Sequence, residues 1–157
     1  MAIIHSSFSL TKTINARPGI LWAIWSDASA KKQWLASNDS PGWTTTSLVM
    51  DFRVGGRERA VWVADDPGQP WHGEHVNDCV YLDIEDGERI VMAYTMTLNG
   101  AVHSAILATV EFHATEDGTE LTYSEHLALY HEHYGIDDRR AGAERLMESL
   151  ANRATSG

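Results

Sequence analysis

Alternation of side-chain character is the feature that most limits what this chain can fold into. The stretch RIVMAYTMTL, residues 89–98, places its larger apolar side chains at every second position. These residues are Ile90, Met92, Tyr94, Met96 and Leu98. Because side chains of an extended strand point to opposite faces in turn, the pattern predicts one face of a sheet. This face is either ordinary core beneath a helix or the wall of a cavity.

Similar strand-like stretches follow one another along most of the chain, separated by turn residues. The expected strands are residues 5–15, 46–54, 57–64, 73–84, 89–98, 101–113 and 119–128. The pair Asn99-Gly100 is the clearest hairpin signal, because both residues accept the positive φ angles of a tight turn. The pattern predicts a curved antiparallel sheet of six to seven strands.

Three segments have helical spacing instead. Two short helices are expected within residues 16–35, where Pro18 suits a first turn and Asp27 or Ser26 can cap the second helix. A longer helix is expected over residues 137–153, with the apolar stripe Ala143, Leu146, Met147 and Leu150. The fold class is therefore α+β, with the last helix on one sheet face. A helix of about four turns is about 25 Å long and cannot cover a long curved sheet alone, so a cavity is a natural expectation.

Bulk composition narrows the possible partners. The 157 residues fit one domain, 1–157, and the formal net charge of −10 disfavours nucleic acid and anionic membranes as partners. The lone cysteine, Cys79, cannot form an internal disulfide, and the first ten residues lack the basic and apolar regions of a signal peptide. No segment approaches the length of about 20 apolar residues that spans a membrane. We therefore expect a cytoplasmic protein.

Several longer motifs point to one family. They are MDFRVGGRER, YLDI with GERIVMAYTM, LATVEF, DGTELTYSEH and DDRRAG, preceded by ARPGILWAIWSDASAKKQWL. In this order and spacing they resemble bacterial single-domain proteins related to the C-terminal domain of the activator of heat-shock protein 90 ATPase. That family belongs to the START-like (SRPBCC, polyketide-cyclase-like) superfamily. The resemblance implies a helix-grip, Bet v-like fold, in which the sheet wraps around a long C-terminal helix. Since the superfamily includes carriers, cyclases, hydrolases and co-chaperone domains, it does not define an activity.

Glu125 is the carboxylate with the most chemical interest. Counting by twos from Leu121 and Tyr123 places it on the inward face of the last strand. A carboxylate there needs hydrogen bonds to offset its desolvation. It is either a ligand anchor or general base, or a partly solvated strand-end residue paired with an arginine.

Other catalytic and metal-binding patterns are weaker. The tracts HGEH (72–75) and YHEHYG (130–135) could bring imidazoles together, but they lack helical spacing and a cysteine pair, so we expect no metal. Cys79 lies within an expected strand, and no nucleophile elbow is present. We expect no cofactor and assign no catalytic residue.

Aromatic and methionine side chains are the better candidates for a binding site. We expect Ile90 and Met92 to meet the last helix, with other residues lining a cavity. The predicted wall consists of Trp62, Tyr94, Met96, Tyr123, Glu125 and Met147. Aromatic faces and flexible thioethers suit a hydrophobic ligand, although such residues also fill ordinary cores.

The segment 101–113 carries apolar residues on both faces, including Val102 and Leu107. Since a solvent-facing side should be polar, either a bulge shifts the alternation or a second subunit covers this face. A homodimer is therefore possible.

Three functions remain open at this point. The first is binding of a small hydrophobic or amphipathic molecule between sheet and helix, without catalysis. The second is the chaperone-regulating interaction that the family name implies. The third is a cyclase or hydrolase that uses Glu125 as acid or base.

Overall fold

The computed structural model describes residues 2–35, 41–130 and 136–156. Within these ranges, seven strands and three helices follow one another in the predicted order. The strands are β1 (Ile4–Ile14), β2 (Trp43–Met50), β3 (Arg57–Ala64), β4 (Gly73–Glu85), β5 (Arg89–Leu98), β6 (Ala101–Ala114) and β7 (Thr119–Leu129). The helices are α1 (Pro18–Ser26), α2 (Ala28–Leu35) and α3 (Ile136–Thr155).

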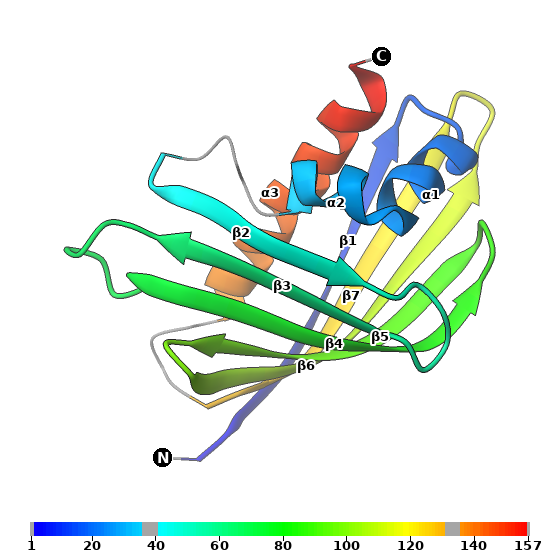
Figure 1. Ribbon diagram of the computed structural model, residues 1–157. Coiled ribbons are helices and arrows are strands. Elements are labelled where there is room, and N and C mark those ends of the chain that lie inside the picture. The colour runs from blue at the N-terminus through cyan, green and yellow to red at the C-terminus, as the bar shows by residue number, and fades with distance from the viewer. Residues whose placement is uncertain (1, 36–40, 131–135, 157) are drawn as a thin grey trace.

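All the strands belong to one antiparallel sheet with the order β1-β7-β6-β5-β4-β3-β2. The first strand therefore pairs with the last, and α1 and α2 carry the chain across to the far edge, where β2 lies (Figure 1). From β2 onward each strand pairs with the next through a hairpin. Asn99 and Gly100 form one of these turns with φ angles of 50° and 85°, as the sequence predicts.

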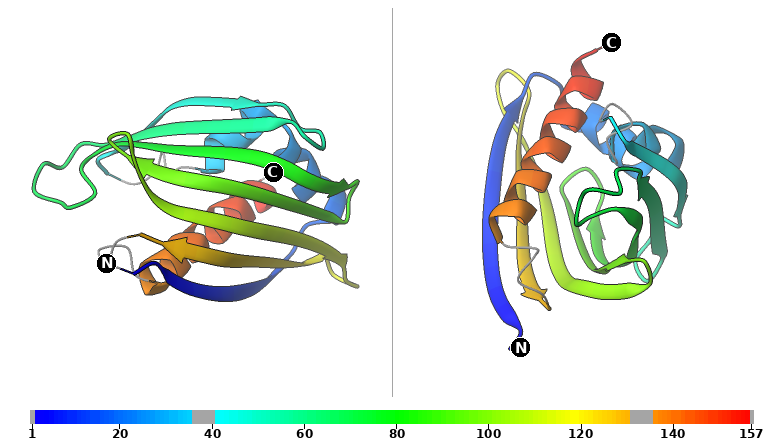
Figure 2. Two further views of the ribbon diagram at one scale, coloured as in Figure 1. Left: turned by 90° about the horizontal axis from the view of Figure 1, so that it is seen from below. Right: turned by 90° about the vertical axis from the view of Figure 1, so that its left-hand side faces the viewer.

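The sheet curls around its concave face, and all three helices lie on that side. Figure 2 shows α3 along β1 and β7, while α1 and α2 close the space toward β2. Ala143, Met147 and Leu150 of the predicted stripe are buried, so α3 places its apolar side against the sheet. This arrangement confirms the predicted α+β helix-grip fold, in which the sheet holds the last helix.

The two short helices form where the sequence signals predict. Pro18 begins α1 in the first turn, where its missing N–H is not needed. Asp27 caps α2, because its carboxylate accepts a hydrogen bond of 2.9 Å from the Ala30 N–H. Trp34 is 2 % exposed, and its indole N–H donates to the Ile24 carbonyl at 2.9 Å. This bond ties α2 to α1.

The range predicted for the second strand, 46–54, is wrong at both ends, because β2 begins at Trp43 and ends at Met50. The Asp51 N–H donates to the Arg57 carbonyl at 2.9 Å, and the chain then turns toward β3. Gly55 has a φ of +80°, and a Cβ on Gly56 would meet the Asp51 carbonyl oxygen at 2.1 Å. The two glycines thus permit a tight turn between the strands, and this turn includes residues 51–54, which were expected in the strand.

A bulge explains part of the mixed pattern in β6. Met96 pairs with Ser104 while Thr97 pairs with Val102, so His103 is an extra residue on β6. The bulge shifts the alternation, as one of the two sequence interpretations required. Val102 and Leu107 nevertheless remain on the outside, 36 % and 42 % exposed.

Candidate functional site

A cavity of about 60 Å³ lies between the concave face of the sheet and the helices. Its walls are mostly apolar, with a few polar groups among them. The lining residues are Trp25, Lys31, Trp34, Leu35, Glu58, Asn77, Cys79, Met92, Tyr94, Tyr123, Ala143, Leu146, Met147 and Leu150. Apolar walls with few polar groups are typical of small-molecule sites.

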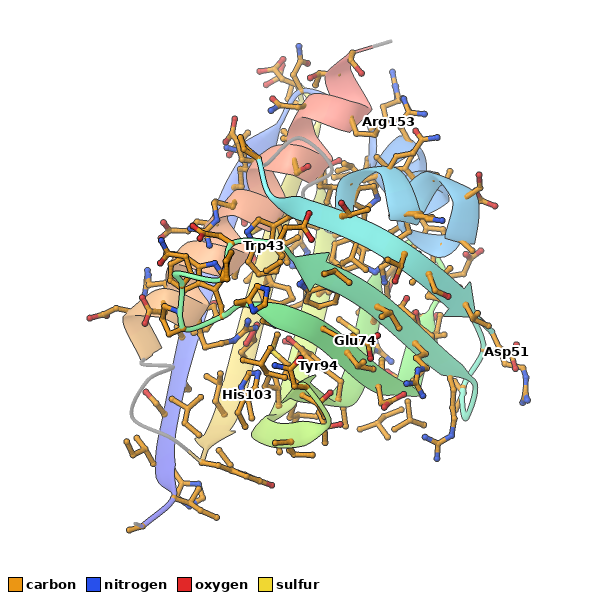
Figure 3. All side chains as sticks on the ribbon, turned by 60° about the vertical axis from the view of Figure 1, so that its left-hand side comes forward. Trp43, Asp51, Glu74, Tyr94, His103 and Arg153 are labelled. Carbon is orange, nitrogen blue, oxygen red and sulfur yellow. The ribbon has the colours of Figure 1, made fainter. Side chains whose placement is uncertain are left out.

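Inward-facing positions on neighbouring strands build the sheet wall of the cavity. Cys79 on β4 pairs in register with Glu58 on β3 and with Tyr94 on β5, so these side chains lie in one row. Tyr94, labelled in Figure 3, is one of the side chains on the concave face of the sheet. The opposite wall comes from α3, where Ala143 and Met147 are one turn apart.

A buried ion pair lies at the α2 side of the cavity. The Lys31 ammonium donates to Glu58 Oε1 at 2.6 Å, and the Tyr81 hydroxyl donates to the same oxygen at 2.6 Å. Lys31 and Glu58 are only 1 % and 6 % exposed. Burial raises the pKa of the Tyr81 hydroxyl, and the Glu58 charge raises it further, so Tyr81 stays a neutral donor. The two charges neutralise each other, and the ion pair joins α2 to β3.

A second buried network surrounds Glu125. Arg139 of α3 donates to both carboxylate oxygens, at 2.9 and 3.0 Å, and Tyr123 donates to Oε2 at 2.6 Å. The Tyr94 hydroxyl donates to Oε2 at 3.2 Å. Burial raises the pKa of Tyr123 and of Tyr94 above the ordinary tyrosine value; the neighbouring Glu125 charge adds to this and Arg139 opposes it. Both tyrosines therefore remain protonated.

The structure brings three of the predicted wall residues to the cavity. Tyr94, Tyr123 and Met147 line it. Glu125 is fully buried in the middle of β7 and is not among the lining residues; the two tyrosines that donate to it are.

Two further predicted residues lie elsewhere on the concave face. Met96 is 8 % exposed and pairs in register with Asn77. Trp62 stacks on His75 with 5.9 Å between ring centroids. Met92, expected to meet the last helix, lines the cavity beside Tyr94.

The sequence analysis did not predict three polar residues of the cavity lining, although two of them carry a detectable sequence signal. Glu58 alternates with Ala60 and Trp62 on β3, so counting by twos would have placed it inward. Asn77 alternates in the same way with Cys79 and Tyr81 on β4. Lys31 had no such signal, because a lysine on a short helix is usually exposed.

The described part of the chain contains no group of three or more histidine, cysteine or acidic residues placed to hold a metal ion. His131 and His133 of the second histidine tract lie outside the described residues. Burial above all, with the Glu58 charge adding to it, raises the pKa of the Cys79 thiol to about 12, so this cavity thiol is not a ready nucleophile. None of the described helices is long and apolar enough to cross a membrane.

Comparison with known families matches residues 15–154 to the family described as Activator of Hsp90 ATPase homolog 1-like protein. The chain belongs to this family. The match leaves out β1 but covers strands β2 to β7, α1, α2 and α3 up to residue 154, so all the cavity-lining residues fall within it. A search among curated proteins finds no match.

Solved structures of similar proteins agree with this assignment. An uncharacterized protein from Rhizobium leguminosarum is 30 % identical, with a TM-score of 0.87, over 99 % of this chain and 98 % of that one. A protein from Rhizobium loti is 31 % identical, with a TM-score of 0.83, over 98 % and 99 % of the two chains. A protein from Aeromonas hydrophila described as like the same activator family is 17 % identical, with a TM-score of 0.71, over 96 % and 93 % of the chains, and shows the shared fold.

Proposed function

We propose that this protein binds a small hydrophobic or amphipathic molecule in the cavity between its sheet and α3. The observation that carries the proposal is the cavity itself, whose mostly apolar wall is drawn from the sheet and all three helices. An ordinary core would be close-packed at this point. Apolar surface from Met92, Met147 and Leu150 would supply the driving force, and the polar groups would orient the ligand.

The direct test is native mass spectrometry of the freshly purified protein, followed by denaturing extraction. The proposal predicts a reproducible bound mass that is released on unfolding. The matched variant is Ala143→Leu, because Ala143 lines the cavity, is 2 % exposed and can direct a larger side chain into it. Ala154→Leu makes the same change on α3 outside the cavity lining and serves as the control.

Loss of the bound mass in Ala143→Leu but not in Ala154→Leu would support the site. The same mass retained by both variants would place the ligand elsewhere. An empty wild-type protein that also fails to take up small apolar molecules would overturn the proposal.

Chaperone regulation is the second candidate, and the family match favours it, since the family description names an activator of the Hsp90 ATPase. The test is whether this protein stimulates the ATPase of a purified chaperone of that class. No stimulation at a large molar excess would remove this candidate.

An enzymatic role for Glu125 is the third. Its two oxygens accept hydrogen bonds from Arg139, Tyr123 and Tyr94, which suits a carboxylate that holds α3 against the sheet. Glu125→Gln keeps the shape and removes the charge. If ligand binding survived while a turnover disappeared, the enzymatic role would be supported.

The outer sheet face is consistent with the expected homodimer. Leu107, Ala93 and Val80 lie side by side across β6, β5 and β4 and point away from the cavity. We infer that this apolar row packs against a second copy. Light scattering would give twice the chain mass of 17.4 kDa for a dimer and the chain mass for a monomer.

A further inference from the structure

Two polar atoms of the cavity-lining residues have no hydrogen-bond partner in the part of the chain that the structure describes. The Trp25 indole N–H and Asn77 Oδ1 have no hydrogen-bond partner among the described residues, and both atoms are shielded from solvent. Trp25 is 5 % exposed, and both residues line the cavity. Since an unpaired buried polar group is costly, each such group in a folded protein calls for an explanation.

Three neighbouring residues of the cavity already have polar partners. The Trp34 indole N–H donates to the Ile24 carbonyl, and Lys31 and Glu58 form their ion pair at 2.6 Å. The two unpaired atoms are one donor, on Trp25, and one acceptor, on Asn77. Both of these unpaired contacts are uncharged.

An unpaired donor together with an unpaired acceptor favours some ligand groups over others. A hydroxyl can accept one hydrogen bond and donate another, whereas an ether oxygen only accepts and a hydrocarbon does neither. A ligand carboxylate would be repelled by the Asn77 oxygen and by the Glu58 charge. A ligand ammonium would be repelled by Lys31 and could not accept a hydrogen bond from Trp25. Lys31 and Glu58 already neutralise each other at 2.6 Å, so a charged ligand end would have to compete with this pair.

We propose that the ligand is an uncharged aliphatic alcohol, or a molecule ending in one, whose hydroxyl lies between Trp25 Nε1 and Asn77 Oδ1. This inference rests on the proposed ligand-binding function and specifies the polar end of the ligand. The cavity volume of about 60 Å³ limits the part that fits without rearrangement to a few carbon atoms. For scale, an engineered cavity of about 150 Å³ admits benzene.

The test compares three probes of similar size: 1-butanol, its isomer diethyl ether, and n-pentane. Binding is followed by titration of ¹⁵N-labelled protein with nuclear magnetic resonance. We expect 1-butanol to bind about tenfold more tightly than diethyl ether, because the ether leaves the Asn77 oxygen unpaired. Butyrate and butylamine at neutral pH should bind more weakly than 1-butanol by at least a similar factor.

The indole N–H signals report the geometry directly. The Trp25 signal, assigned from Trp25→Phe, should shift strongly with 1-butanol as its N–H gains an acceptor. The Trp34 signal is an internal control from the same cavity, because its N–H already donates to Ile24 and should shift little.

Asn77→Leu tests the acceptor, since leucine has a similar size and no oxygen. In this variant the preference for 1-butanol over diethyl ether should fall to about onefold, while n-pentane binds at least as tightly as before. A preference that stays tenfold in Asn77→Leu would overturn the role of Asn77.

Failure of this inference and failure of the proposed function give different results. If all three probes bind equally and the Trp25 N–H signal does not move, the cavity binds ligands but the hydroxyl assignment is wrong. If no probe perturbs the cavity residues, ligand binding in this cavity is wrong and the hydroxyl assignment falls with it. The wild-type series decides both points even if Asn77→Leu does not fold.

Discussion

Two buried ion pairs in the described part of the protein have similar components and different surroundings. In each, a carboxylate on the concave face of the sheet binds a cation from a helix and a tyrosine hydroxyl: Glu58 with Lys31 and Tyr81, and Glu125 with Arg139 and Tyr123. Lys31 and Glu58 line the cavity themselves, whereas Glu125 and Arg139 do not.

The difference in surroundings shows that a buried ion pair can join a helix to the sheet with or without contributing to the cavity wall. Tyr94 and Tyr123 line the cavity and donate to Glu125, which does not line it. The bond from Arg139 to Glu125 joins α3 to β7. The Lys31–Glu58 pair joins α2 to β3 and also gives the cavity a polar side. Removing either pair should therefore affect stability, and removing the second should also affect the ligand.

The largest effect is expected at Glu125. Glu125→Leu should lower the free energy of unfolding by about 3–5 kcal/mol, because Arg139 loses its carboxylate while its side chain is only 14 % exposed. Denaturant unfolding measures the change. The double variant Glu125→Leu/Arg139→Leu removes both charges and should recover most of the loss. A single variant with wild-type stability would show that this network does not hold α3.

A smaller loss is expected at the other pair. Lys31→Met should cost about 2–3 kcal/mol, because Glu58 keeps the hydrogen bond from Tyr81. The control is Lys32→Met at the neighbouring exposed position, which should change stability by less than about 1 kcal/mol. If both lysine variants lost the same stability, the buried pair would have no special role in holding α2.

Cys79 lies between the two ion pairs, so the reactivity of its thiol measures how accessible the space between them is. Its pKa of about 12 leaves about one thiol in 10⁴ ionised at pH 8, so the folded protein should react very slowly with Ellman's reagent. Unfolded protein should react at the ordinary rate. Glu58→Gln should raise the folded rate modestly, because the Glu58 charge contributes to the raised pKa. Rapid labelling of the folded wild-type protein would contradict the buried position of Cys79.

The smallest effect is expected from His75, whose ring nitrogen bonds the Trp71 carbonyl at 2.6 Å and whose ring stacks on Trp62. Burial lowers the pKa of His75 below 6.5, although the bond to Trp71 opposes this. The unfolded chain therefore binds more protons below about pH 6.5, and stability should fall as the pH decreases through that range.

Unfolding of His75→Gln at pH 5 and pH 7 measures the contribution of His75. This variant should show a weaker loss of stability at the lower pH than the wild-type protein. His113→Gln, at a site with 57 % side-chain exposure, is the control and should keep the wild-type dependence. Identical pH dependence in all three proteins would exclude a role for His75.

The sequence by itself determined the order and kind of the elements. Period-two alternation, the Asn99-Gly100 turn, Pro18 at the start of α1 and the apolar stripe of α3 are local signals, and each appears in the structure where it was expected. Counting by twos also placed Glu125 on the inward face, because the alternation of a strand needs no knowledge of its neighbours. The end of β2 was misplaced because the turn after Met50 depends on hydrogen bonds to Arg57 across the hairpin.

Only the tertiary structure decided which inward side chains share the cavity. Glu125 finds Arg139 through the docking of α3, and Lys31 reaches Glu58 because α2 lies over β3. Likewise, the unpaired atoms of Trp25 and Asn77 come from α1 and β4, which are far apart in the chain. The physical reason is that alternation selects the face of a strand, whereas the contacts across that face depend on how separate elements pack together.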